Sequence, residues 1–314
     1  MNQLLLGDCL TLMKNLASGT VDLILTDLPY GTTSCKWDAV IPLDLMWAEY
    51  RRVLRPRGTI ALTASQPFTS QLVMSNPGMF RVEWIWEKNR GSNFATTKYF
   101  PMKEHESVLI FGNGPGIFNP IMEERAATGK SRVKTPIKAS NTGKRETMSG
   151  FIDTYEPQIR SEMRVPRSIQ KFNTEVGLHP TQKPVALFEY LIRTYTDPKM
   201  QVLDTCMGSG TTGVACRRLD REFIGMELDP VYFDVAQRRI MATIPSHELA
   251  DAAGVPGHDA PAHNADHGLH ESDQPAAGLP AQRAEGEPAT AGAGGAVDAR
   301  EQYFAGREAP GSDH

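Results

Sequence analysis

A glycine-rich turn between an apolar run and a helical pattern constrains this chain more than any other feature. The segment LDTCMGSGTTG spans residues 203–213. Glycine lets the backbone approach a ligand closely, and the first turn of a helix attracts negative groups. Gly208, Gly210 and Gly213 also fit the pattern G-x-G-x-x-G of dinucleotide-binding proteins, although a single match is weak evidence. The segment therefore predicts a strand, a ligand-binding loop and a helix, in that order.

Short apolar runs alternate with amphipathic segments along most of the chain before residue 246. The predicted strands are 21–26, 59–63, 81–86, 107–111, 200–203 and 222–226, and the predicted helices are 42–54, 66–74, 184–195, 210–219 and 231–241. This alternation favours an α/β fold in which helices cover both faces of a mainly parallel sheet. Ligands of such sheets bind at the carboxyl ends of the strands.

A second segment of chemical interest, Asp27-Leu28-Pro29-Tyr30-Gly31, follows the first predicted strand. Proline lacks a backbone N–H and stiffens the turn. The segment thus offers a carboxylate and a main-chain carbonyl, which are both acceptors, beside an aromatic ring. Such a set suits a planar substrate that carries an amino group, such as a nucleobase. In isolation, however, the pentapeptide is better explained as a strand-end turn with a capping aspartate.

Charge is distributed unevenly along the chain, whose net charge is −4. Residues 125–171 contain 11 basic residues (Lys and Arg) and 4 acidic residues (Asp and Glu). Residues 246–314 contain 3 basic and 12 acidic residues. A polyphosphate partner would bind the basic stretch, and a solvated surface explains that stretch about equally well. The acidic stretch has almost no periodic apolar content, so we expect it to be disordered. The predicted organisation is 1–111 and 177–245 as two halves of one domain, 112–176 as a basic target-recognition region, and 246–314 as an acidic tail.

The cysteines indicate neither a disulfide framework nor a metal site. Cys9, Cys35, Cys206 and Cys216 form no Cys-x-x-Cys pair and no ligand cluster. We therefore expect reduced cytosolic thiols and no metal. The apolar runs are too short to span a bilayer, and no secretory signal is recognisable at the start of the sequence. A cytoplasmic protein without membrane contact is the resulting expectation.

Five segments in a fixed order resemble the amino-methyltransferase family of bacterial and phage DNA methyltransferases. They are GDC at 7–9, DLPYG at 27–31, HPTQKP at 179–184, LDTCMGSGTTG at 203–213 and FIGMELDP at 223–230. The catalytic segment precedes the cofactor segment, which resembles the β-type arrangement. The resemblance implies a Rossmann-like methyltransferase fold, with a mainly parallel seven-stranded sheet, one antiparallel strand and helices on both faces.

The resemblance also implies a reaction and a set of site residues. The cofactor would be S-adenosyl-L-methionine. The substrate would be an exocyclic amino nitrogen of a base that is flipped out of double-stranded DNA. The acid at the start of the catalytic segment favours N6 of adenine as the target. By resemblance, Asp27 and the Leu28 carbonyl would accept the amino N–H groups, and Tyr30 would stack on the base. The catalytic residues would be Asp27, Leu28, Pro29 and Tyr30, and the cofactor-binding residues Asp8, Cys9, Thr181, Lys183, Asp204, Cys206, Gly208, Ser209, Gly210, Thr211, Thr212 and Glu227.

Individual cofactor contacts follow from the same resemblance. Lys183 and Thr181 would pair with the methionine carboxylate of the cofactor. Glu227 would accept hydrogen bonds from the ribose, and Asp8 would accept one from the adenine amino group. Asp204 and the turn at 208–210 would hold the methionine part.

The chain departs from the family pattern in two places, and three alternatives remain open. Leu28 replaces the first proline of the catalytic segment, and Thr205 and Cys206 replace a proline and an aromatic residue. N4 of cytosine is the nearest alternative target. A nicotinamide-dependent oxidoreductase is disfavoured because its glycine motif normally opens the first βαβ unit, and an inactive DNA-binding decoy is the third alternative. The sequence leaves open a homodimer and a cognate restriction enzyme as partners.

Overall fold

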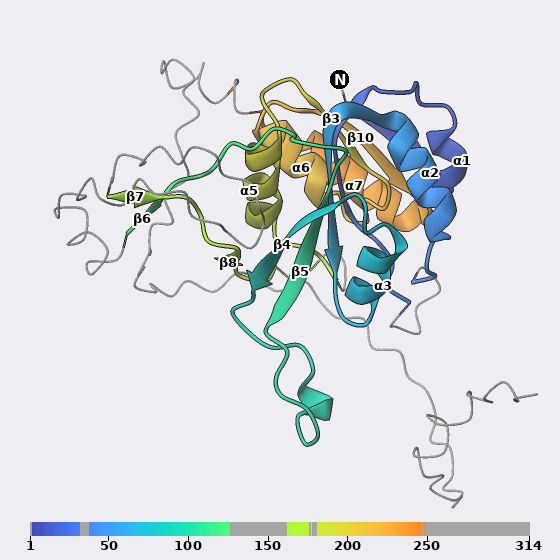
Figure 1. Cartoon of the computed structure of the whole chain (residues 1–314). Helices are drawn as coiled ribbons and strands as arrows, with labels where there is room; N and C mark the ends of the chain where they lie inside the picture. Colours follow the sequence, from blue (N-terminus) through green and yellow to red (C-terminus); the bar gives the residue numbers. More distant parts are fainter. Residues whose placement is uncertain are drawn as a thin grey trace, which may run out of the picture. The chain divides into compact units, whose positions relative to one another are not determined.

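The computed structural model describes residues 2–31, 38–125, 162–175, 177, 181–245 and 248, which all belong to one compact unit (Figure 1). Several sequence predictions fall outside the described residues. They concern most of the basic stretch 125–171, residues 179–180 of the HPTQKP segment, Cys35, and all of the predicted tail except Glu248.

One eight-stranded sheet forms the centre of the molecule. Its strands are β1 (Gln3–Leu6), β2 (Val21–Asp27), β3 (Leu54–Ala64), β4 (Phe80–Glu87), β5 (His105–Phe111), β8 (Ile169–Lys171), β9 (Gln201–Asp204) and β10 (Glu222–Glu227). They lie in the order β1-β10-β9-β2-β3-β5-β4-β8. Within this sheet β5 runs antiparallel to both of its neighbours, and every other neighbouring pair is parallel. The mainly parallel sheet with one antiparallel strand is confirmed.

The strand count differs from the seven that the resemblance implies. The additional strand is β8, which lies at the sheet edge parallel to β4, with Ile85 opposite Ile169. It comes from the region 112–176 that we predicted to be a separate recognition region. Its three residues are too few for an apolar alternation to be recognised in the sequence. The same region contributes β6 (Glu123–Glu124) and β7 (Met163–Arg164), which form a small antiparallel pair.

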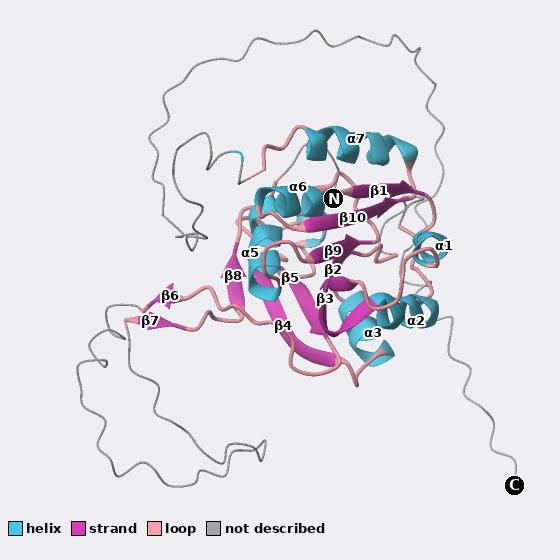
Figure 2. Cartoon of the chain, turned by 90° about the horizontal axis from the view of Figure 1, so that it is seen from above, coloured by secondary structure: helices cyan, strands magenta, loops and turns pink. Residues whose placement is uncertain are grey.

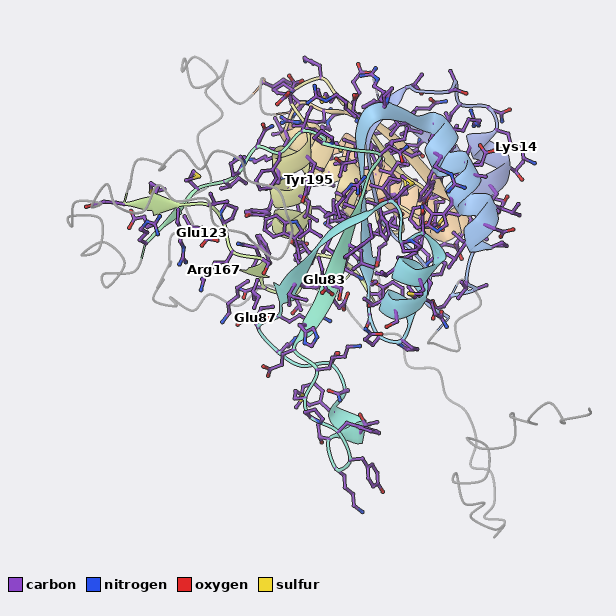
Figure 3. All side chains as sticks on the ribbon, in the orientation of Figure 1. Lys14, Glu83, Glu87, Glu123, Arg167 and Tyr195 are labelled. Atoms are coloured by element: carbon purple, nitrogen blue, oxygen red, sulfur yellow. The ribbon has the colours of Figure 1, made fainter. Side chains whose placement is uncertain are left out.

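Side-chain contacts connect the β6–β7 pair to the edge of the main sheet. Glu123 accepts hydrogen bonds from Arg164 at 3.0 Å and from the Gln170 amide of β8 at 2.6 Å. Arg167 lies 3.5 Å from the same carboxylate, and Figure 3 shows Glu123 and Arg167 between β7 and β8. The described part of 112–176 is thus attached to the sheet rather than independent of it.

Helices cover both faces of the sheet, as predicted (Figure 2). One face carries α1 (Cys9–Met13), α2 (Leu43–Val53) and α3 (Phe68–Ser75), and the other carries α5 (Val185–Tyr195), α6 (Thr211–Arg218) and α7 (Pro230–Met241). The start of α7 follows the usual rules, because the Asp229 side chain accepts from the N–H of Val231 and Pro230 occupies the first turn. No helix within the described ranges is both long and apolar enough to cross a bilayer.

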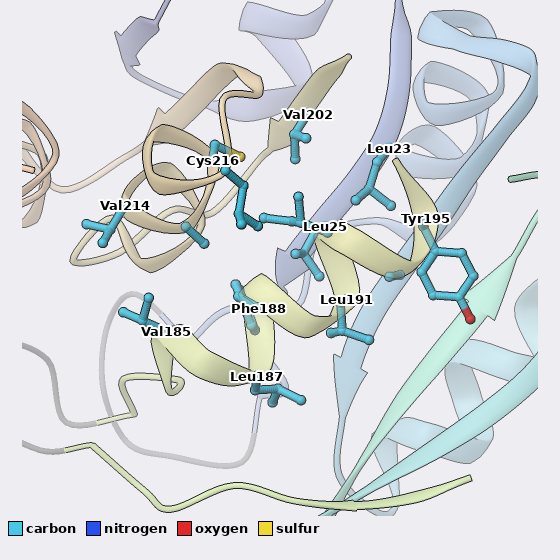
Figure 4. Close-up of a cluster of buried hydrophobic side chains, with 14 of the residues drawn as sticks. Leu23, Leu25, Val185, Leu187, Phe188, Leu191, Tyr195, Val202, Val214 and Cys216 are labelled. Atoms are coloured by element: carbon cyan, nitrogen blue, oxygen red, sulfur yellow. The ribbon is translucent and has the colours of Figure 1, made fainter. Parts of the chain in front are cut away.

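The burial of β2 fixes the position of the residues that follow it. Leu23 and Leu25 point into the cluster formed with α5 and α6 (Figure 4), whereas Ile24 points into the cluster on the opposite face. All three side chains are fully buried. Completely burying such a side chain stabilises the fold by roughly 1.5–3 kcal/mol. A strand covered on both faces needs a continuous apolar run, and Asp27 is the first residue that leaves this environment.

Candidate active site

Three carboxylates lie side by side at the carboxyl edge of the sheet. Asp27 ends β2, Asp204 ends β9 and Glu227 ends β10, and these strands are neighbours in the order β10-β9-β2. The strand order changes direction between β9 and β2, which is where α/β sheets open a crevice for ligands. Residues almost two hundred positions apart in the sequence therefore meet at one edge.

A cavity of about 1060 Å³ opens at this edge. It brings together fifteen of the sixteen predicted site residues, namely Asp8, Cys9, Asp27, Leu28, Pro29, Tyr30, Thr181, Lys183, Asp204, Cys206, Gly208, Ser209, Thr211, Thr212 and Glu227. Gly210 is the exception. It adopts φ +82° at the start of α6, and a β-carbon there would lie only 3.0 Å from Ala236 and Ile240 of α7. Gly210 thus serves the turn and the packing of α7.

Asp27 is held by three donors from three different parts of the chain. The Tyr30 hydroxyl donates to its Oδ1 at 2.8 Å, and the Thr63 hydroxyl of β3 donates to the same oxygen. Lys183 Nζ donates to Oδ2 at 2.7 Å. An ionised carboxylate offers about four acceptor positions, so one position on Oδ2 is left for a ligand in the cavity.

Lys183 is the buried cation of the site, with 6% of its side chain exposed. Its ammonium group also lies 3.4 Å from Glu106 of β5, and Glu106 in turn pairs with Lys88. Burial alone would lower the pKa of Lys183, but the charges of Asp27 and Glu106 raise it above its usual range. The sequence predicted a pairing with the cofactor carboxylate, whereas the structure places this ammonium group on Asp27 and Glu106.

The Tyr30 ring is supported from the side by another aromatic residue. Phe68 of α3 stacks on it with ring centroids 5.3 Å apart and an interplanar angle of 24°. Lys183 Nζ lies 5.6 Å from the centroid of the Tyr30 ring. Burial and the neighbouring negative charge of Asp27 raise the pKa of Tyr30 well above its usual range, so its hydroxyl remains protonated. Phe68, Thr63, Glu106 and Lys88 were not predicted from the sequence, because no local motif marks them.

Among the described residues, the hydrogen-bond donors to Asp204 are all neutral. The Thr26 hydroxyl donates to Oδ1 at 2.7 Å, the Cys206 N–H donates to the same oxygen at 3.0 Å, and the Thr212 hydroxyl donates to Oδ2. Burial raises the pKa of Asp204 to about 6, although these donors act in the opposite direction. Next to it, the Tyr50 hydroxyl of α2 lies 2.6 Å from Thr205 Oγ1 and fixes the turn after β9.

Glu227 closes the glycine turn from the neighbouring strand. Its Oε2 accepts from the Gly208 N–H at 2.8 Å and its Oε1 from the Asp229 N–H at 2.9 Å. Gly208 has φ +50°, a left-handed conformation that glycine adopts readily. Burial raises the pKa of Glu227, which these two backbone donors oppose. The carboxylate is thereby oriented at the wall of the cavity.

Asp8 and Cys9 complete the wall below the glycine turn. Asp8 caps α1, since its Oδ1 accepts from the Thr11 N–H at 2.9 Å. The thiols of Cys9 and Cys206 are hydrogen-bonded to each other, which lowers the pKa of Cys9. These small side chains hold the segment after β1 against the turn after β9.

Comparison with known proteins assigns the family. Residues 21–238 match the family model for DNA methylases of the N6/N4 type. The type II methyltransferase M.HpaI of Haemophilus parainfluenzae is 28% identical over 254 residues, which cover 76% of this chain and 74% of the relative. The type II methyltransferase M.BglII of Bacillus subtilis is 27% identical over 260 residues, which cover 75% and 68%.

Solved structures of DNA methyltransferases share the fold. The complex of M1.HpyAVI with S-adenosylmethionine matches with a TM-score of 0.52 and 25% identity, over 76% of this chain and 99% of that one. The cytosine-N4-specific PvuII DNA methyltransferase matches with a TM-score of 0.53 and 16% identity, over 80% and 90%. Since the family model spans well over half of the sequence, this chain belongs to the N6/N4 DNA methylase family and is an S-adenosylmethionine-dependent DNA methyltransferase of that class.

Proposed function

We propose that this enzyme methylates N6 of adenine in double-stranded DNA, with Asp27 as the acceptor that activates the amino group. One observation carries the proposal. The Asp27 carboxylate lines the same cavity as Gly208 and Glu227, and it retains one acceptor position that no donor among the described residues uses. A methyl donor on one side of the cavity and an amino group on the other would therefore meet in front of Asp27.

The residues at the cofactor side fit S-adenosylmethionine. This cofactor supplies a methyl group on a positively charged sulfur, and it also carries an ammonium group. Asp204 is a buried carboxylate that has three neutral donors and no cation among its hydrogen-bond partners, so a bound cation would stabilise its ionised form. Glu227 would accept hydrogen bonds from the ribose hydroxyl groups, and Asp8, which also lines the cavity, would accept one from the adenine amino group. Thr181 remains our proposed partner for the methionine carboxylate.

The residues at the transfer side fit an exocyclic amino group. A base in a duplex must first be flipped out, at a cost of a few kcal/mol. In the cavity, Asp27 Oδ2 would accept one amino N–H and the Leu28 main-chain carbonyl the other. These acceptors would draw the nitrogen toward tetrahedral geometry and stabilise the positive charge that develops on it. Leu28 is 4% exposed and packs in the core, and it also lines the cavity, so its main-chain carbonyl would serve as the second acceptor although leucine replaces proline.

The Tyr30 ring, supported by the buried Phe68, would provide the aromatic surface for the base. Stacking of a base on an aromatic side chain is worth ~1–3 kcal/mol in single-strand binders, which offsets much of the cost of flipping. Lys183 would hold the Asp27 carboxylate in its orientation while the amino group is bound. An acid at the start of the catalytic segment favours adenine over cytosine by family resemblance.

Identification of the methylated nucleoside tests this proposal. Unmethylated DNA of mixed sequence is incubated with the enzyme and S-adenosylmethionine, digested to nucleosides and analysed by mass spectrometry. We expect N6-methyladenine with the wild-type enzyme and with Asp44→Asn, a control at an exposed carboxylate on α2, and none with Asp27→Asn. N4-methylcytosine would overturn the choice of base, and full activity of Asp27→Asn would overturn the role of Asp27.

A further inference from the structure

The connection between β4 and β5 is a long loop that the catalytic site only partly uses. It covers residues 88–104, includes the short helix η1 (Phe94–Thr96), and extends away from the sheet beyond the ends of both strands (Figure 1). Its side chains project freely at the far end of the loop (Figure 3). The loop is therefore available for contact with another molecule.

Three aromatic side chains of this loop face solvent. Phe94 is 64% exposed, Tyr99 72% and Phe100 63%. Large apolar side chains that gather at an exposed loop indicate an interaction site, because a folded protein gains nothing from leaving them in water. Aromatic rings in particular are suited to stacking on other flat groups.

The charge of the loop is predominantly positive, and its one acidic residue is Glu104 at the end next to β5. Residues 88–103 contain Lys88, Arg90, Lys98 and Lys103, and no aspartate or glutamate. Arg90 and Lys98 are exposed, and Lys98 Nζ lies 5.5 Å from the centroid of the Tyr99 ring. Exposed cations interleaved with exposed aromatic rings are the combination that binds phosphates and bases together.

Internal hydrogen bonds hold the loop in shape. The Asn93 side chain donates to the Pro101 carbonyl at 3.0 Å and accepts from the Lys103 N–H at 2.7 Å, which ties the two arms of the loop together. The Lys88 N–H donates to the Glu104 carbonyl at 2.7 Å where the arms join the strands. A loop ordered before binding loses less conformational entropy in a complex.

The near end of the loop belongs to the catalytic cavity. Residues Arg90, Gly91, Ser92, Asn93 and Phe94 line it together with Asp27 and Tyr30. Phe94 is thus an exposed aromatic residue at the rim of the cavity that would receive the base. A base in this cavity would therefore lie in a space that Phe94 helps to line.

We infer that residues 89–103 form a DNA-binding loop that contacts the duplex next to the flipped base. This inference rests on the proposed function. Flipping leaves a gap in the base stack, and apolar side chains inserted between bases stabilise such gaps in other DNA-binding proteins. Phe94 fills the gap or stacks on its neighbouring base, Tyr99 and Phe100 contact bases or sugars further along, and Arg90 and Lys98 pair with phosphates. The positive charge favours DNA over a second copy of the chain, because two such loops would repel each other.

Substitution of the aromatic residues tests the inference. The variant Phe94→Ser/Tyr99→Ser/Phe100→Ser is compared with the control Met74→Ser/Met241→Ser, which removes two exposed apolar residues from α3 and α7. Fluorescence anisotropy measures binding of a labelled duplex, and titration calorimetry measures binding of S-adenosylmethionine. We expect the triple variant to bind the duplex at least about tenfold more weakly, with cofactor affinity unchanged, and the control to bind like wild type.

A second variant isolates the charges. Arg90→Gln/Lys98→Gln should reduce the slope of log affinity against log salt concentration by about 2, because each lost phosphate contact lowers it by about 0.9. Unchanged duplex affinity of the triple variant together with an unchanged salt slope of the double variant would overturn the inference. A change of oligomeric state in the triple variant, with duplex affinity per protomer unchanged, would also overturn it and assign the loop to self-association.

The two proposals fail in different ways. If the wild-type enzyme transfers no methyl group to DNA but binds the duplex through this loop, the proposed function fails and the loop assignment stands. If the wild-type enzyme methylates DNA and the triple variant matches its duplex affinity and its KM for DNA, the loop assignment alone fails.

Discussion

The two sides of the cavity hold a carboxylate by different means, one partly buried and the other buried. At the transfer side, Asp27 pairs with the ammonium group of Lys183, which Glu106 also contacts. At the cofactor side, Asp204 has only hydroxyl and backbone N–H donors, and burial raises its pKa to about 6. The protein itself supplies a cation to the first carboxylate, whereas the described residues supply only neutral donors to the second. The difference fits our proposal that one side of the cavity activates an amino group and the other binds a positively charged methyl donor.

The largest effect is expected at the cation of the transfer side. Lys183→Met leaves Asp27 and Glu106 without the cation between them, and breaking a buried ion pair costs roughly 3–5 kcal/mol of stability. Urea unfolding measures this loss. Glu106 keeps Lys88 as its partner, so Asp27 is the stranded charge, and removing it in Lys183→Met/Asp27→Asn should recover part of the stability. A double variant that is no more stable than Lys183→Met would show that the charges are not coupled.

Asp204 should make stability depend on pH. Its pKa is higher in the folded chain than in the unfolded chain, so between about pH 4 and 6 the folded state holds a proton that the unfolded state has lost. Stability therefore falls as pH rises through this window. Relative to Asp204→Asn, the free energy of unfolding of the wild type should decrease by about 3 kcal/mol from pH 4 to pH 7. Parallel pH profiles of the two proteins would contradict this.

Glu227 should act on cofactor binding alone. Glu227→Gln keeps the shape of the side chain but weakens its hydrogen bonds to the Gly208 N–H and to the proposed ribose hydroxyls. Hydrogen bonds to charged groups are worth roughly 1.5–3 kcal/mol, so we expect the Kd for S-adenosylmethionine to rise by about tenfold or more. Calorimetry measures the Kd, and single-turnover transfer at saturating cofactor should stay close to the wild-type rate. A slow rate with an unchanged Kd would assign Glu227 to the transfer side.

Two buried tyrosine hydroxyls give the finest comparison. The Tyr30 hydroxyl donates to Asp27, whereas the Tyr50 hydroxyl bonds with Thr205 beside Asp204. Tyr30→Phe should slow transfer by less than about tenfold, as expected for the loss of one hydrogen bond, and leave the Kd for cofactor unchanged. Tyr50→Phe should alter the Kd and leave the rate unchanged. If both variants changed the transfer rate and the Kd for the cofactor equally, the distinction between the transfer side and the cofactor side of the cavity would be wrong.

The sequence predicted those parts of the molecule that local patterns encode. The runs around Leu23 and Leu203 are apolar because both faces of the sheet are covered, and the glycine turn follows from the conformation of Gly208. The strand β8 was missed because three edge residues carry no recognisable period. Thr63, Glu106 and Phe68 were also missed, because only the tertiary structure brings them to the site. Thr63 reaches Asp27 because β3 pairs with β2. Glu106 reaches Lys183 through the place of β5 in the sheet, and Phe68 reaches Tyr30 through the packing of α3.

The role of Lys183 shows what a motif alone leaves open. The place of Lys183 in the HPTQKP segment predicted a binding residue. Whether its ammonium group contacts the cofactor or Asp27 depends on where the chain before α5 crosses the sheet. Gly210 illustrates the same point, because its match to a glycine pattern reflects packing against α7 as much as ligand binding.

The central claim is that Asp27 acts on the amino group and not on the cofactor. The direct test is the variant Asp27→Ala, with S-adenosylmethionine binding measured by calorimetry and methyl transfer to DNA measured in a single turnover. We predict a Kd close to that of the wild type and a transfer rate lower by at least about 10²-fold. A wild-type transfer rate, or a loss of cofactor binding that accounts for the whole defect, would contradict the claim.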